Sequence, residues 1–61
     1  MQTNEVLRDT DDHYVDVTID RSKNTVTLFI DNIRFSEQTT VTMTVGEMHE
    51  FVFSLQEFLK E

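Results

Sequence analysis

The sequence predicts an α+β domain in which a three-stranded antiparallel meander is followed by one C-terminal helix that packs on one face of the sheet. Aliphatic residues occupy every second position over residues 14–20 (Val15, Val17 and Ile19) and again over residues 25–31 (Val26, Leu28 and Ile30). This pattern is typical of half-buried strands. Over residues 47–59 the apolar residues instead recur every three or four positions, which indicates an amphipathic helix. We therefore expect a flexible acidic N-terminal arm, residues 1–12, and a single β-β-β-α domain, residues 13–61.

The first two strands are expected to form a hairpin. Residues 21–24, Arg-Ser-Lys-Asn, make a polar connection of hairpin length between them. A register that places every apolar side chain on one face pairs Ile19 with Val26, Val17 with Leu28, and Val15 with Ile30. Because a slip of one residue would expose the whole apolar set, this register should be firmly specified.

The third strand is expected over residues 39–44, with Val41 and Met43 facing inward. Ile33 and Phe35 have the opposite parity to the apolar residues of the second strand, which predicts a bulge or turn near Asp31. Residues 36–38, Ser-Glu-Gln, favour a second turn before the third strand begins.

The helix has a clear start signal. Thr44 and Glu47 have the spacing of a capping box, in which each side chain accepts a hydrogen bond from the other residue's backbone N–H. Met43 and Met48 occupy the two positions of a hydrophobic staple around this cap. Downstream, one broad apolar stripe is formed by Met48, Phe51, Val52, Leu55, Phe58 and Leu59. This stripe predicts the side of the helix that faces the sheet.

The composition leaves the domain short of stabilising elements. A chain of 61 residues buries only about 60% of its unfolded surface. It contains no cysteine and no proline, so neither a disulfide nor a thiolate zinc site can compensate. Small domains without such elements commonly gain stability by oligomerisation, and we expect a homodimer.

The charge narrows the range of partners. Twelve acidic residues oppose five basic ones, for a formal charge of −7. This argues against direct nucleic-acid binding and against attraction to anionic membranes, because both require clustered Lys and Arg. Residues 1–12 have no apolar core typical of a signal peptide, and the apolar runs are too short to span a bilayer. We expect a soluble cytoplasmic protein.

Two surfaces are candidates for partner binding. Phe53 lies off the apolar stripe, on a helix flank shared with His49, Gln56 and Lys60. It is either a single exposed aromatic residue, which needs no explanation, or a contact with a second chain. The outer sheet face carries Tyr14 and Phe29 as diagonal neighbours, and Asp16, Asp20 and Asp31 could make the surface negative. For this face the simpler interpretation is a hydrated surface whose charge maintains solubility.

The sequence contains no catalytic, cofactor or metal motif. One glycine and no cysteine exclude a glycine-rich phosphate loop and a thiol nucleophile. Asp9-Thr10-Asp11 has the opening spacing of a calcium loop. However, Tyr14 and Asp20 stand where that loop requires glycine and a bidentate glutamate. We expect no enzyme activity, no cofactor and no bound metal.

The leading hypothesis is a small acidic, non-enzymatic protein-interaction module that forms a homodimer through Phe53 or through the sheet face with Tyr14 and Phe29. Its carboxylates would bind, or also inhibit, a protein with a basic surface, for example one that normally holds nucleic acid. In size, acidity and absence of catalytic motifs the chain is similar to small phage-encoded inhibitors of host enzymes. The alternative is a structural or assembly module that pairs through its sheet edges within a larger complex. A small-ligand binder with a groove between helix and sheet is a third hypothesis.

Overall fold

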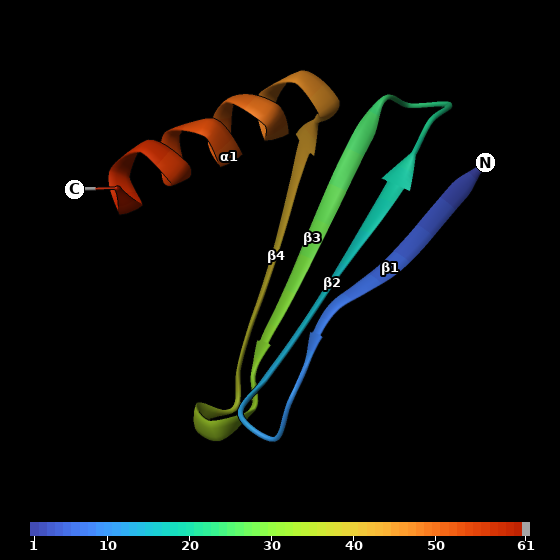
Figure 1. Cartoon of the computed structure of the whole chain (residues 1–61). Coiled ribbons are helices and arrows are strands. Elements are labelled where there is room, and N and C mark those ends of the chain that lie inside the picture. The colour runs from blue at the N-terminus through green and yellow to red at the C-terminus, as the bar shows by residue number, and fades with distance from the viewer. Residues whose placement is uncertain (61) are drawn as a thin grey trace.

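A computed structural model describes residues 1–60 as one antiparallel sheet followed by one helix (Figure 1). The four strands lie in the order β1-β2-β3-β4, so that every strand pairs with its neighbours in sequence. The elements are β1 (Gln2–Asp9), β2 (His13–Asp20), β3 (Thr25–Asn32), a short 3-10 helix η1 (Ile33–Phe35), β4 (Glu37–Thr44) and α1 (Val45–Leu59).

The predicted α+β class is confirmed, but the predicted number of strands is wrong. Residues 2–9, which were expected to belong to a flexible arm, form an additional edge strand, β1, that pairs with β2 along its length. Every residue of β1 is exposed to solvent. The pairing of β1 therefore depends mainly on backbone hydrogen bonds to β2. The sequence of β1 has no alternation of apolar and polar residues from which a strand could have been predicted.

The β2–β3 hairpin has the predicted register. Val15 lies opposite Ile30, Val17 opposite Leu28, and Ile19 opposite Val26. The connecting turn ends at Asn24, whose φ of 54° lies in the left-handed region. Asparagine tolerates this region better than most other residues, so the last residue of the turn suits its conformation.

The β3–β4 connection is shorter than predicted. Strand β3 continues through Asn32, and a single turn then replaces the two that were expected. Ile33 and Phe35 belong to η1 rather than to a strand, which explains their discordant parity. Ser36 closes the turn with a φ of 54°, and β4 begins at the next residue.

The predicted capping box is present at the start of α1. Thr44 Oγ1 accepts a hydrogen bond from the Glu47 N–H at 3.1 Å, and Glu47 Oε1 accepts one from the Thr44 N–H at 2.9 Å. Because Thr44 is both the last residue of β4 and the N-cap, the chain passes from strand to helix without a linker.

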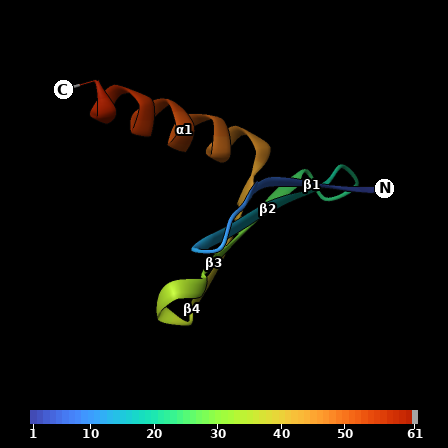
Figure 2. The ribbon, with the colours of Figure 1, turned by 60° about the horizontal axis from the view of Figure 1, so that its bottom comes forward.

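The prediction that α1 covers one face of the sheet holds only for its first turns. Figures 1 and 2 both show the C-terminal part of α1 leading away from the strands. Val45 and Met48 are half-buried, whereas every described residue from His49 onward is exposed. Among residues 1–60, Val26 is the only buried hydrophobic residue, with 5% of its surface exposed. The protomer therefore has almost no closed core.

Candidate functional site

The face of the sheet turned away from α1 carries a pair of aromatic side chains on its two central strands. Tyr14 on β2 and Phe29 on β3 have ring centroids 6.2 Å apart and planes tilted by 60°, a separation and tilt favoured by aromatic pairs. Both residues are half-buried. The predicted aromatic pair is confirmed.

Three carboxylates surround this pair, and we call the five residues together the aromatic–acidic face. Asp16 lies opposite Phe29, while Asp9 and Asp31 lie opposite Tyr14 on its two neighbouring strands. The Tyr14 hydroxyl donates a hydrogen bond to Asp16 Oδ2 at 3.0 Å. This hydrogen bond, followed by burial and the negative charges of Asp16 and Asp9, raises the pKa of Tyr14 above its ordinary value.

A β-bulge in β1 determines the sign of the charge next to Tyr14. Between Val6 and Arg8 the register shifts by one residue, so that Arg8 lies opposite Val15 and Asp9 lies opposite Tyr14. In an uninterrupted ladder Arg8 would instead face Tyr14, because antiparallel partners advance one for one. The bulge thus places Arg8 on the other face and adds Asp9 to this one. Asp9 was not predicted from the sequence to lie on this surface.

The aromatic–acidic face has little internal charge compensation. The register places no Lys or Arg of β1–β4 on this side of the sheet. In the described part of the chain the only ion pair joins Lys60 to Glu57, at 3.4 Å on the helix. Asp16 Oδ2 accepts from the Tyr14 hydroxyl, and Asp31 Oδ2 accepts a long hydrogen bond from Gln38 Nε2 at 3.5 Å, so each keeps its Oδ1 for an external cationic group.

Asp20 lies on the same side of the sheet but is engaged within the fold. Its Oδ1 accepts hydrogen bonds from the Ser22 hydroxyl at 2.7 Å and the Ser22 N–H at 3.1 Å. The Ser22 hydroxyl chiefly lowers the pKa of Asp20, and together with the Ser22 N–H and longer hydrogen bonds from Gln2 and the Lys23 N–H it outweighs partial desolvation. Asp20 stabilises the β2–β3 turn, and we do not include it in the aromatic–acidic face.

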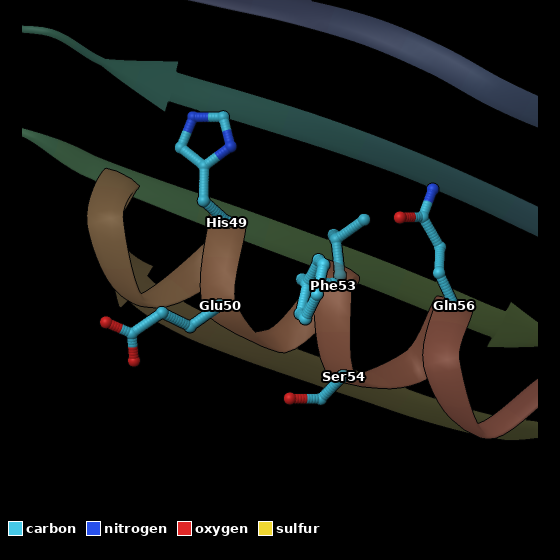
Figure 3. Close-up of a pocket in the computed structure, with 6 residues that line it drawn as sticks. His49, Glu50, Phe53, Ser54 and Gln56 are labelled. Atoms are coloured by element: carbon cyan, nitrogen blue, oxygen red, sulfur yellow. The ribbon is translucent and has the colours of Figure 1, made fainter.

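The flank of α1 that carries Phe53 forms the second candidate surface. A shallow hollow there is lined by His49, Glu50, Val52, Phe53, Ser54 and Gln56. All of these residues belong to one helix, so the hollow lacks an opposite wall. Figure 3 shows His49 and Gln56 pointing to one side of α1 and Glu50 and Ser54 to the other. Phe53 is 62% exposed, and Lys60 pairs with Glu57 at the end of the helix.

A third feature is an apolar groove between α1 and the sheet. It has a volume of about 350 Å³ and is lined by Val17, Ile19, Val26, Val45, Met48, His49 and Val52. His49 is the only titratable group in this lining. Such a surface favours apolar contact and offers little for acid–base chemistry.

Neither a protein-family model, nor a curated protein, nor a solved structure matches this chain. Within residues 1–60 no three His, Asp or Glu side chains gather as a metal site would require. The same residues contain no helix with the length and apolarity needed to cross a membrane.

Proposed function

We propose that this chain is a non-enzymatic protein-interaction module that acts as a homodimer and binds a basic surface on another protein. The aromatic–acidic face is the observation that carries the proposal. It combines a half-buried aromatic pair with three carboxylates on a side of the sheet where the strands carry no cation. Aromatic rings and carboxylates together suit Arg, whose guanidinium both stacks on rings and forms forked hydrogen bonds to carboxylates.

The homodimer is supported by the exposed apolar surface on the helix side. Five residues of the apolar stripe, Phe51, Val52, Leu55, Phe58 and Leu59, are each between 42% and 69% exposed. Contiguous apolar surface of this kind marks an interaction site in a folded protein. We therefore assign self-association to the helix side and binding of the basic partner to the opposite sheet face.

Capture from a cell lysate at low and high salt tests the binding of a basic partner. The wild-type chain is compared with Asp16→Asn/Asp31→Asn and with Glu50→Gln/Glu57→Gln, a control of equal net charge whose carboxylates are lost from α1. We expect the wild type and the control to retain the same basic proteins at low salt, and the Asp16/Asp31 variant to lose them. Equal loss from both variants would show that net charge alone is responsible and would refute the role of this face.

A second candidate function is assembly through the edges of the sheet. In the described chain β1 and β4 each pair on one side only, which leaves two outer edges. The bulge in β1 interrupts its edge, as is common where proteins prevent edge-to-edge pairing. The edge of β4 is therefore the better candidate. Assembly that persists at high salt and is lost when β4 carries a proline would favour this function.

A further inference from the structure

We infer that the second copy of the chain completes the fold by exchange, with α1 of each protomer lying on the apolar sheet face of the other. This inference rests on the homodimer in the proposed function and specifies its interface. Besides Met43, four apolar residues of the sheet face the same side as the apolar groove but lie outside its lining: Val15, Leu28, Ile30 and Val41. All four are only half-buried.

The chain's own helix is held away from this part of the sheet. No linker separates β4 from α1, and the capping box fixes the direction in which the helix begins. In addition, the Val45 N–H donates a hydrogen bond to the Asn24 carbonyl at 3.2 Å, which attaches the helix start to the β2–β3 turn. Because folding back would break these bonds, the apolar stripe of α1 remains available to another chain.

The donor and acceptor surfaces match in length. The exposed part of the stripe, residues 51–59, extends over about 13 Å at 1.5 Å per residue. On β3 the residues beyond the groove, 28–32, extend over about 16 Å. The exposed part of a helix from a second copy can therefore lie along the free part of the acceptor strands without overhanging them.

The area is also sufficient for a stable dimer. The exposed fractions of the five stripe residues from Phe51 to Leu59 correspond to on the order of 450 Å² of mostly apolar surface per helix. Two helices, each covering an equal area of sheet, would bury on the order of 1,800 Å² in total, close to the size of a standard specific interface. The helix flank that carries Phe53 offers only one exposed ring and lacks an opposite wall.

The distribution of charge also favours contact between the apolar stripe of α1 and the apolar sheet face. Two protomers of formal charge −7 repel each other, so a self-contact is favoured where carboxylates are few. On the acceptor face the only two, Glu5 and Glu37, lie on the edge strands, and Arg8 lies on the same side. The apolar stripe contains no charged residue, and Glu50 and Glu57 lie on the opposite side of α1. Glu47 borders the stripe, where its carboxylate accepts the Thr44 N–H of the capping box. A dimer through the aromatic–acidic face would instead bring Asp9, Asp16 and Asp31 of both copies together.

An isotope-filtered NMR experiment tests this arrangement on the wild-type chain. A sample mixed from labelled and unlabelled protomers reports only contacts between the two copies. We expect intermolecular contacts from the rings of Phe51 and Phe58 to the methyl groups of Val15 and Ile30. Intermolecular contacts confined to helix against helix would overturn the exchanged arrangement and leave the homodimer standing. Absence of any intermolecular contact, with a monomer found by sedimentation, would overturn both.

Two helix variants provide a second test that adds the same charge to different sides of α1. Phe58→Asp places a carboxylate on the apolar stripe, and we expect its dimer dissociation constant to rise on the order of 100-fold because the charge would have to be buried. Ser54→Asp places a carboxylate on the acidic side and should change the constant by less than about threefold. Equal dimerisation by both variants would exclude the stripe from the interface. Basic-partner binding by the aromatic–acidic face is measured separately and does not depend on this result.

Discussion

The Val45 N–H and the Asn24 carbonyl, 3.2 Å apart, join the start of the helix to the turn between β2 and β3. Asn24 and Val45 are distant in sequence but meet because Thr25 lies opposite Thr44 at the end of the β3–β4 ladder. This hydrogen bond and the capping box act on the same short segment. Together they fix the angle at which α1 leaves the sheet and thereby leave its apolar stripe uncovered in the protomer.

Replacing Thr44 by Ala should destabilise the protein by about 1 kcal/mol, because the Glu47 N–H loses its side-chain acceptor. Thr44→Ser retains the hydroxyl and should remain close to wild type. Urea unfolding at a fixed protein concentration measures the difference. A Thr44→Ala variant as stable as wild type would mean that the cap contributes nothing to the strand-to-helix transition.

Tyr14 is the only tyrosine, so its ionisation can be followed by near-ultraviolet absorbance without interference. We expect a midpoint above the ordinary value of 10.0 because the Tyr14 hydroxyl donates to Asp16 and lies near Asp9. Asp16→Asn should lower the midpoint toward that value by removing the charged acceptor. In the folded protein the raised pKa stabilises the neutral phenol, so this contribution is present below pH 10.0 and is lost as the pH rises through the folded value. A midpoint unchanged in Asp16→Asn would contradict the assigned contact.

Asp20 should contribute to stability at neutral pH and lose that contribution in acid. Its pKa in the folded protein is lowered from the ordinary value of 3.8, chiefly by the Ser22 hydroxyl. The contribution is therefore full above the unfolded value and disappears as the pH falls through the lower folded value. Unfolding measured between neutral pH and pH below 3.8 should show a smaller acid-induced loss in Asp20→Asn than in wild type. Identical pH profiles would exclude this role for the carboxylate.

Ser36 adopts a left-handed conformation with a φ of 54°, which costs a residue with a side chain roughly 1 kcal/mol or more relative to glycine. Ser36→Gly should therefore be neutral or stabilising by up to about 1 kcal/mol, since part of the relief is offset by the entropy of the unfolded chain. Ser54→Gly, in the middle of α1, should instead destabilise by about 0.5–1 kcal/mol. Thermal unfolding of both variants measures this opposite response, and a destabilised Ser36→Gly would contradict it.

The elements with an apolar period could be predicted from the sequence, and β1 could not. Val17 and Leu28 each belong to a series of aliphatic residues at every second position, and this pattern predicted both the strands and their register. Strand β1 has no buried face, so its pairing with β2 relies on backbone groups that are the same in any sequence. The direction in which α1 leaves the sheet could not be predicted either. An apolar stripe indicates that one side of a helix is covered, but not whether the same chain or a second chain covers it.

The candidate site was predicted only in part, because some of its residues lie on the predicted hairpin and one lies on β1. The pairing of Tyr14 with Phe29 followed from the hairpin register, and Asp16 and Asp31 followed with it. Asp9 was missed because its position depends on a bulge in a strand that the sequence did not reveal. Asp20 was predicted as a contact for a partner, although the Ser22 hydroxyl and N–H occupy its Oδ1 within the turn.

Thermal unfolding at two protein concentrations tests most directly whether a second copy completes this fold. For a protomer whose only buried hydrophobic residue in the described chain is Val26, unfolding should be coupled to dissociation. A roughly 100-fold increase in protein concentration should then raise the midpoint by on the order of 10 °C. A sharp, reversible transition with the same midpoint at both concentrations would show that the lone protomer is stable by itself and would contradict the homodimer.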